Sequence, residues 1–409
     1  MSEIIKNRPL SKLATKEQVL GGSHGMQNHS VLNVREDLST GATTQLPLEV
    51  EFEKKSIRKK IAVVLFNLGG PDSLQAVKPF LFNLFNDKYI ITLPSILRFF
   101  IAKLISSRRE KFAQGIYINT GGKSPILQET ISQKEALKKE LIKNKDTDFE
   151  IFICMRHWHP MSEEVVKNIK NYNPEEIILL PLYPQFSTTT TASSIDKFVK
   201  NLNKEFLDKI KLKTICCYPL DERFIDSHVK LIEEKLRNND DLNNFKMLFS
   251  AHGLPEKIVK SGDPYQWQIE QTVLKIIAKL KLKPKFKNID YKVTYQSRVG
   301  SLKWLEPNTE DEIKIAGGAN KSLIIIPVAF VSEHVETLVE LDIEYKKIAD
   351  YYKIGYIRIP TLSTNNLFIK SLANMILNFA QKESVSLSSS SFSRICPSVY
   401  SKCPCYRTQ

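Results

Sequence analysis

IAVVLFNLG (residues 61–69) opens with six consecutive apolar residues, and comparable runs of strand length recur along the chain. A strand that is buried on both faces of a parallel sheet reads as a continuous apolar run, whereas a half-exposed strand alternates. The other runs are FEIFICM (149–155), EIILLPLYP (176–184), KTICCYP (213–219), KMLFSAH (246–252), YKVTYQS (291–297), SLIIIPVAF (322–330) and IGYIRIP (354–360). We therefore predict strands of the buried, parallel type at these eight places.

Segments between these runs repeat apolar residues every three or four positions, as at 161–172 and 338–348. That spacing gathers the apolar residues on one face of a helix. Strands that alternate with helices predict an α/β fold with parallel sheets. Two groups of four strands predict two similar lobes, each a four-stranded parallel sheet flanked by helices, with a cleft between them. In such sheets ligands gather at the carboxyl ends of the strands.

The composition is that of an ordinary soluble protein, with 42% apolar and 25% charged residues among 409. A formal charge of +14 and a pI of 9.3 favour anionic partners. The lysines are scattered, however, so solubility explains most of this charge, and no basic–aromatic stripe supports nucleic-acid binding. No apolar run approaches the ~18 residues of a membrane span. With no secretory signal or transit peptide visible, we expect a cytoplasmic protein and disfavour a two-lobed solute-binding protein.

Composition also divides the chain. Residues 1–56 are polar and aperiodic and predict a disordered extension without its own core. We expect the first lobe at 57–228, the second at 229–380, and a Ser- and Cys-containing tail at 381–409.

The stretch ITLPSILRFFIAKLISSRREK (91–111) is apolar and then basic, ending on Arg108, Arg109 and Lys111. It is too short and too interrupted to span a bilayer. It would suit a helix that lies on a membrane surface or beside an apolar pocket. An amphipathic helix packed on the core explains the pattern equally well.

LFSAHGLP (248–255) places His252, one of only seven histidines, at the end of a predicted strand. A packed ring and a group that meets a ligand are both consistent with this position. The pair in RHWHP (156–160), His157 and His159, has no adjacent third ligand, so packing or an anion contact is favoured over a metal. The Gly turns NLGGPDS (67–73) and TGGKSPI (120–126) match neither a dinucleotide fingerprint nor a P-loop.

The segment VAFVSEHVETLVELDIEYKK (328–347) carries four carboxylates at spacings of 3, 4 and 4, which are Glu333, Glu336, Glu340 and Glu344. If the segment is helical from about Ser332, these side chains stack along one face, where like charges repel. Such rows are usually solvated. This one begins beside His334 at a strand end and contains no interleaved lysine, which suits a path for protons or a cation.

Six cysteines are too few for a disulfide scaffold in a chain of this length and suit a reducing compartment. Cys216 and Cys217 are adjacent and would point to opposite faces of a strand. Cys396, Cys403 and Cys405 crowd the C-terminus, where three nearby thiols would be able to bind a metal.

Taken together, the chain resembles the ferrochelatase family of class I chelatases. The resemblance extends over about 61–380 and rests on motifs in the family's order: LFNLGGPDS, GGKSPI, MRHWHP, LYPQFSTTTTASS, FSAHGLP, YQSRVG with WLEPNTED, and PVAFVSEHVETLVELDIEY. It implies two Rossmann-like domains with a porphyrin cleft between them. It also implies insertion of ferrous iron into protoporphyrin IX to give protohaem, with coproporphyrin as the alternative substrate.

The resemblance implies roles for particular residues. His252 and Glu336 are expected to be the catalytic pair and to contact the metal. The acidic path is expected to comprise Glu333, His334, Glu340 and Glu344. The expected porphyrin-binding residues are Leu68, Arg108, Arg109, Tyr117, Ser124, Arg156 and Tyr295. The segment 91–111 is expected to form an apolar lip in peripheral contact with the inner face of the membrane.

The chemistry suits these residues. A porphyrin loses two pyrrole N–H protons when it takes a divalent metal, and a neutral imidazole such as that of His252 can accept them. Arg and Ser side chains can anchor the propionates. A glycine such as Gly253 would leave room for a flat macrocycle. A non-catalytic tetrapyrrole-binding protein of the same fold is the competing hypothesis, and we expect a monomer or a homodimer.

One departure from the family concerns cofactors. Animal members and some bacterial ones carry an iron–sulfur cluster, and in the animal pattern one ligand lies where this chain has Thr188. The C-terminal spacing Cys396-x6-Cys403-x-Cys405 also differs. Both differences argue against a cluster, and we expect no organic cofactor, with ferrous iron as substrate.

Overall fold

Two parallel sheets form the framework of the protein. A computed structural model describes residues 58–239, 241–298 and 302–407, so the predicted extension at 1–56 lies outside the described residues. The first sheet has the order β2-β1-β3-β4-β9 and the second the order β6-β5-β7-β8. The strands are β1 (Lys59–Asn67), β2 (Thr147–Met155), β3 (Glu176–Pro181), β4 (Lys211–Ile215), β5 (Phe245–His252), β6 (Asp290–Gln296), β7 (Ser322–Pro327), β8 (Tyr356–Arg358) and β9 (Leu387–Ser388).

All eight strands expected from the apolar runs are present, and the α/β class is confirmed. The expectation of four strands per sheet is right for the second sheet and wrong for the first, which gains β9 at its edge beside β4. β9 has only two residues in a Ser-rich segment, so it is too short to show a period. Without β9, the two sheets share one order, in which the second strand lies outside the first.

The continuous apolar runs reflect burial on both faces. In β1, every residue from Ile61 to Phe66 is at most 1% exposed. Ile61, Val63 and Leu65 join one hydrophobic cluster, while Ala62, Val64 and Phe66 join another on the opposite face. Alternate side chains of this strand therefore pack into two cores, and from Ile61 to Phe66 neither face carries a polar residue.

Helices cover both sheets. The helices of six or more residues are α1 (Val77–Phe85), α2 (Ser95–Ile118), α3 (Ile126–Leu141), α4 (Ser162–Tyr172), α5 (Ser193–Asn201), α7 (Glu222–Lys235), α9 (Tyr265–Lys281), α10 (Thr309–Gly318), η3 (Glu336–Tyr345), α11 (Lys346–Tyr351) and α12 (Asn366–Gln381). The shorter ones are η1 (Thr188–Ala192), α6 (Lys204–Leu207), α8 (Glu256–Lys260), η2 (Pro284–Phe286) and η4 (Pro404–Arg407). None of the helices in the described ranges combines the length and the apolar composition that a membrane-spanning helix requires.

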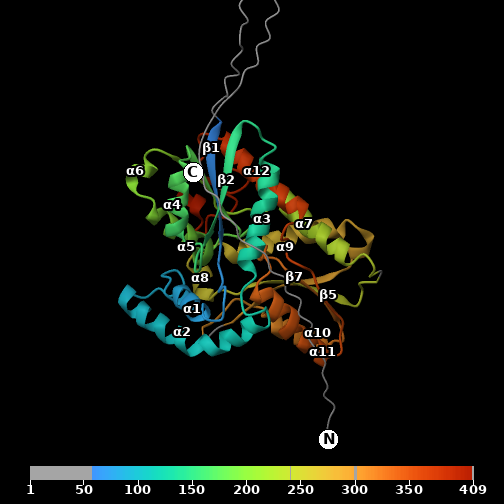
Figure 1. Cartoon of the computed structure of the whole chain (residues 1–409). Coiled ribbons are helices and arrows are strands. Elements are labelled where there is room, and N and C mark those ends of the chain that lie inside the picture. Colours follow the sequence, from blue (N-terminus) through green and yellow to red (C-terminus); the bar gives the residue numbers. More distant parts are fainter. Residues whose placement is uncertain (1–57, 240, 299–301, 408–409) are drawn as a thin grey trace, which may run out of the picture. The chain divides into compact units, whose positions relative to one another are not determined.

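The two sheets share one hydrophobic core. A single cluster of buried side chains includes Leu65 of β1, Phe249 of β5 and Ile376 of α12. Helix α12 follows β8 of the second sheet in the chain, yet it packs against α3 and α7 and against strands of the first sheet (Figure 1). The boundaries at 57–228 and 229–380 therefore stay predictions, with α12 returning to the first lobe.

The strand order of the second sheet determines where a ligand site is expected. The connection from β5 leads to β6 on one side, while β7 leads to β8 on the other, so the order reverses between β5 and β7. Ligands of open α/β sheets bind at such a switch point, beyond the carboxyl ends of the strands. His252 ends β5, and η3 belongs to the connection that follows β7.

Candidate active site

His252 and Glu336 meet at this switch point. Nδ1 of His252 lies 2.9 Å from Oε2 of Glu336. A carboxylate can only accept, so Nδ1 carries the proton and donates it, which leaves the lone pair of a neutral ring on Nε2. The His252 side chain keeps 36% of its surface exposed, and that of Glu336 keeps 24%. The pair is therefore partly open and has one basic nitrogen to offer.

Each partner changes the pKa of the other. Burial alone would lower the pKa of His252, but the negative charge of Glu336 and the hydrogen bond to it outweigh burial and raise that pKa. Burial alone would raise the pKa of Glu336, but His252 and then His334 hold it well below its usual range. Glu336 is consequently an anion at neutral pH, and His252 is more basic than an ordinary imidazole.

Gln296, at the end of β6, supports this pair, and the sequence analysis missed it. Its Nε2 donates to the backbone oxygen of Glu336 at 3.1 Å and to Oε2 of Glu340 at 3.0 Å. Ser250 donates to Oε1 of Gln296 at 2.7 Å, which orients the amide. Gln296 pairs with His252 in the parallel ladder of β5 and β6, so only strand pairing could have pointed to it.

Glu340 lies beside Glu336 in a ring of donors. It accepts from the backbone N–H of Ser297 at 2.9 Å, from the Ser297 hydroxyl, and from the Tyr345 hydroxyl at 2.8 Å. Burial, followed by the neighbouring charge of Glu336, raises the pKa of Glu340 despite these bonds. Glu340 is thus the carboxylate in this group that protonates more easily.

The expected row of four carboxylates on one helical face is not formed. Residues 336–345 adopt a π-helix, whose hydrogen bonds join i to i+5, and Glu333 precedes it. Glu333 instead accepts from Arg358 at 2.5 Å and from the backbone N–H of Thr361 at 2.9 Å. Glu344 is exposed. Among the four, the structure brings only Glu336 and Glu340 to His252.

His334 is buried next to the pair. Its Nδ1 lies 3.1 Å from the backbone oxygen of Ser332, and its Nε2 lies 3.7 Å from Oε2 of Glu336. Donation to this carbonyl places a proton on Nδ1, while Nε2 faces the Glu336 carboxylate. The ring packs on Phe330, with centroids 4.7 Å apart.

Tyr117 of α2 comes close to the pair from the other lobe. It is 6% exposed, and Trp158 and Val335 pack against its cluster. Burial and then the charge of Glu336 raise its pKa, so it stays protonated. Tyr295, by contrast, packs in the hydrophobic core with its hydroxyl unpartnered among the described residues.

The remaining porphyrin-binding candidates lie in the first lobe, and in the described part of the chain none of them forms a hydrogen bond or an ion pair with His252. Arg156 is held by Asp87 at 2.8 Å and by Ser193 at 2.6 Å, so its charge is largely neutralised. Leu68 follows β1 and is half-buried, as is Ser124. On α2, Arg108 is exposed and Arg109 half-buried.

The histidine pair of RHWHP does not form a metal site. His157 is fully buried, and burial holds its pKa well below the usual range, so it is a neutral packed ring. His159 is exposed, with Nδ1 3.7 Å from Glu164 at the surface. This agrees with the packing interpretation.

Gly253 is required by the packing of the neighbouring strand, which differs from the expectation that it leaves room for a macrocycle. A Cβ at this position would lie 2.8 Å from the backbone oxygen of Gln296 and 3.3 Å from the Trp304 ring. The Gly253 N–H donates to that same oxygen at 2.9 Å. The glycine therefore admits the neighbouring strand end rather than leaving open room for a macrocycle.

Five thiols converge far from His252 in the sequence. Cys216, Cys217, Cys396, Cys403 and Cys405 form one buried cluster, and none of them is in a disulfide. Sγ of Cys216 lies 3.6 Å from Sγ of both Cys217 and Cys405, and Cys403 hydrogen-bonds to both Cys396 and Cys405.

The amide of Gln268 completes this ring of thiols. Its Nε2 lies 3.5 Å from Sγ of Cys217 and 3.1 Å from Sγ of Cys396. The sulfurs thus contact one another, and in this arrangement no group of three or more His, Cys, Asp or Glu side chains in the described ranges is spaced to hold a metal ion. Soft thiolates are nevertheless the ligand type of iron–sulfur clusters.

Thr188, the residue that argued against a cluster, is engaged elsewhere. Its hydroxyl and its backbone N–H both donate to Oδ2 of Asp263 at 2.7 Å. Cys216, at the end of β4, brings a thiol to the three C-terminal ones from another part of the chain. Thr188 therefore says nothing about whether four thiols are available.

Several large apolar side chains of α2 lie at the surface, although Ala102, Ala113 and Tyr117 of the same helix are buried. Leu97, Phe100, Leu104 and Phe112 are 50–65% exposed. This contradicts the alternative of an amphipathic helix that packs its apolar residues on the core.

Comparisons with known proteins agree with this geometry. A family model described as Ferrochelatase matches residues 60–379. Proteins named Ferrochelatase from Rickettsia bellii (strain OSU 85-389) and Rickettsia felis are each 58% identical to the chain, over 85% and 86% of it and over 96% and 100% of their own lengths. One from Pelagibacter ubique is 50% identical over 85% of the chain and 98% of its own length.

Proposed function

The chain belongs to the ferrochelatase family of metal chelatases, and we propose that it inserts ferrous iron into protoporphyrin IX, releasing two protons and forming protohaem. The observation that carries this proposal is the hydrogen bond between His252 and Glu336 at the switch point of the second sheet. It supplies a base whose Nε2 is free and whose other nitrogen is held by an anion.

We propose that His252 accepts the pyrrole protons. Glu336 orients the ring and stabilises the imidazolium that forms, as a buried carboxylate does for a catalytic histidine. As the protons leave the pyrrole nitrogens, ferrous iron takes their place, so charge balances at two protons per metal. His252 and Glu336 are also the proposed contacts of the incoming iron, since imidazole and carboxylate both bind it.

The acidic path is proposed to consist of His334, Glu336 and Glu340. Glu340 has the raised pKa of the two carboxylates, so it is suited to take a proton from the pair and pass it on. Glu333 and Glu344 were expected to extend this path. Glu333 is neutralised by Arg358, and Glu344 lies exposed at a distance along η3, so neither is supported by a contact with the pair.

Substrate contacts are proposed for the first lobe. Tyr117 approaches Glu336 from α2, and Arg108 and Arg109 offer positive charge for propionates from the same helix. The exposed apolar side chains of α2 support peripheral contact with the inner face of a membrane, where a hydrophobic porphyrin would be delivered. We propose a cytoplasmic location on this basis.

The thiol cluster supports a cofactor proposal that differs from the expectation of no cluster. Cys216, Cys396, Cys403 and Cys405 would hold an iron–sulfur cluster, with iron–thiolate bonds replacing the thiol hydrogen bonds. The cluster would supply a covalent link between β4 and the C-terminal tail. Cys217 would remain a fifth thiol on Gln268.

A metallation assay tests the function. Purified protein without oxygen would receive ferrous iron with either protoporphyrin IX or coproporphyrin, and metalloporphyrin would be followed by absorbance. We expect turnover with protoporphyrin. Preference for coproporphyrin would change the substrate, and binding without metallation above the buffer blank would favour the non-catalytic tetrapyrrole-binding protein.

A further inference from the structure

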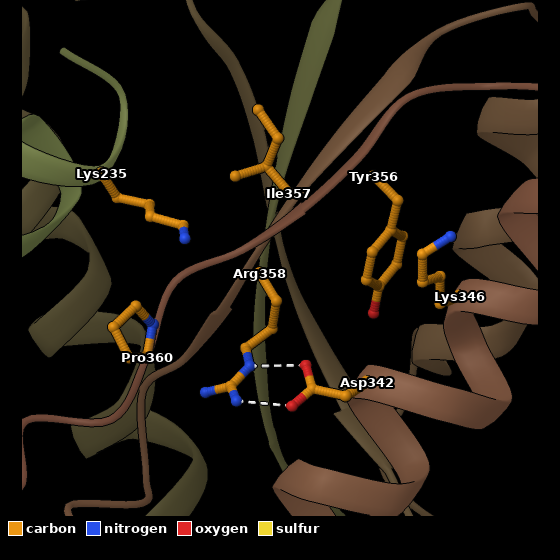
Figure 2. A pocket seen from close by; sticks show the side chains of 7 residues that line it. All are labelled: Lys235, Asp342, Lys346, Tyr356, Ile357, Arg358 and Pro360. Carbon is orange, nitrogen blue, oxygen red and sulfur yellow. Dashed lines mark hydrogen bonds and ion pairs between the residues drawn. The ribbon is translucent and has the colours of Figure 1, made fainter. Parts of the chain in front are cut away.

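Arg358 ties together two carboxylates that flank the catalytic glutamate. It ends β8 and is 14% exposed. Its Nε and Nη2 donate to the two oxygens of Asp342 at 2.7 and 2.6 Å, and its Nη1 donates to Glu333 at 2.5 Å. Figure 2 shows the guanidinium and the Asp342 carboxylate facing each other (Figure 2). This forked geometry is available to arginine and not to lysine.

The two partners bracket the segment that carries Glu336. Glu333 lies three residues before Glu336, and Asp342 lies six residues after it, inside η3. Both are thereby joined to one guanidinium on the edge strand of the sheet. The segment that follows β7 is thus attached to β8 on both sides of Glu336, the residue that contacts His252.

Further bonds from β8 and from the residues just after it strengthen this closure. The Tyr356 hydroxyl donates to the backbone oxygen of Leu341 at 2.6 Å. The backbone N–H of Thr361 donates to Glu333 at 2.9 Å. A π-helix is seldom adopted and is characteristic of functional sites, so η3 needs such external bonds to hold its geometry.

Arg358 also separates two kinds of carboxylate. Glu333 and Asp342 both accept hydrogen bonds from its guanidinium, whereas none of the described lysines and arginines forms an ion pair with Glu336 or Glu340. Burial would raise the pKa of Glu333, but the charge of Arg358 and the hydrogen bonds from Thr337, Thr361 and Arg358 together outweigh burial and lower that pKa. Glu333 therefore stays ionised and engaged, away from the proton path.

We propose that Arg358 is a positioning residue of the chelatase reaction: by holding Glu333 and Asp342, it keeps the π-helical segment in the register that presents Glu336 to His252. This inference rests on the proposed roles of His252 and Glu336. Arg358 touches neither the proposed substrate site nor His252, so it acts on turnover and not on porphyrin affinity.

A surface pocket makes the idea testable by chemical rescue. The pocket has a volume of about 460 Å³, and Figure 2 shows the residues around it: Lys235, Asp342, Lys346, Tyr356, Ile357, Arg358 and Pro360. Small solutes can reach the Arg358 side chain through this opening. In Arg358→Ala, a methylguanidinium ion can therefore enter and restore the fork between Glu333 and Asp342.

The experiment measures metallation by wild type and Arg358→Ala with and without methylguanidinium. We expect the kcat of the variant to fall about tenfold or more, with the KM for porphyrin unchanged, because a small displacement of a catalytic group costs that much. Methylguanidinium at about 20 mM, far below denaturing concentrations, should restore kcat at least about threefold. Methylammonium lacks the planar fork and should not.

Lys346→Gln is the matched control. Lys346 lines the same pocket, but its ion pair with Asp350 at 2.8 Å lies at the surface. The kcat of Lys346→Gln should equal that of wild type with either solute. A wild-type kcat in Arg358→Ala, or a reduced kcat that methylguanidinium leaves unchanged, would overturn the proposal.

Two further measurements keep the result interpretable. If Arg358→Ala does not fold, Arg358→Lys replaces it: a lower kcat with an unchanged porphyrin KM supports the proposal, and a wild-type kcat overturns it. Wild type and His252→Ala are assayed in parallel. If wild type is inactive, or if His252→Ala is active, the proposed function is wrong. If wild type is active, His252→Ala is inactive and Arg358→Ala keeps the wild-type kcat, only the proposed role of Arg358 is wrong.

Discussion

Nδ1 of His252 lies 2.9 Å from Oε2 of Glu336, although the two residues are 84 positions apart in the chain. The parallel pairing of β5 with β7 brings them together, because it places both strands' carboxyl ends at one edge of the sheet. The catalytic proposal follows from this contact, since the carboxylate fixes which ring nitrogen is basic.

His252→Ala should abolish metallation while porphyrin binding, measured by fluorescence quenching, largely survives. Loss of a general base typically costs about 10²- to 10⁴-fold in rate. His159→Ala is the matched control, because His159 is exposed at the surface, where its Nδ1 lies 3.7 Å from Glu164 and its ring contacts Trp158. Turnover of His252→Ala within about twofold of wild type would remove it from the mechanism.

Glu336→Gln should lower the pKa of His252. In wild type the carboxylate favours the protonated ring, so His252 holds its proton to a higher pH than an ordinary imidazole. Proton acceptance, and with it turnover, should therefore decline as the pH falls through that raised pKa. Removing the charge shifts the titration to lower pH, which NMR of the histidine ring in the metal-free protein can follow.

Glu336→Gln should also be severely impaired in turnover at every pH, since the amide cannot stabilise the imidazolium as an anion does. An unchanged kcat would take Glu336 out of the proton or metal path. An unchanged His252 titration would contradict the contact itself.

Protein purified without oxygen should contain iron and acid-labile sulfide and absorb visible light, if the thiols hold a cluster. Cys216→Ser should lose that absorbance, because it removes the ligand that β4 contributes. Cys154→Ser should keep it, since Cys154 is buried apart from the cluster beside Ser162. If wild type purified without oxygen contained no more iron and acid-labile sulfide than the buffer, the cluster proposal would be refuted.

Phe100→Glu should weaken co-sedimentation with anionic lipid vesicles. Phe100 is 63% exposed on α2, so the substitution places a charge in the apolar surface without a core cavity. Leu282→Glu is the control, because Leu282 is 84% exposed but lies after α9. Equal binding of both variants and wild type would argue against α2 as the contact surface.

Much of the fold could be predicted because burial leaves a direct mark on composition. The strands were visible in the sequence as apolar runs, and the helix at 162–172 was visible as a periodic pattern of apolar residues. β9 could not be predicted, since two residues carry no period. The π-helix at 336–345 could not be distinguished from an α-helix, because its apolar residues satisfy either spacing.

The candidate site was predictable only in part. His252 and the glutamates of 333–344 were visible as polar residues where strands end. Gln296 and Arg358 were not, because each looks ordinary in its own segment and acquires its partners only through strand pairing.

The sequence by itself determined the fold class, the strand ends and the family, because these depend on local composition and on the order of motifs along the chain. The tertiary structure alone decided which carboxylate contacts His252, which carboxylates pair with Arg358, and which thiols lie in contact with one another. Hydrogen bonds and charge pairs act over a few ångströms in space, and the folding of distant segments onto one sheet edge sets those distances.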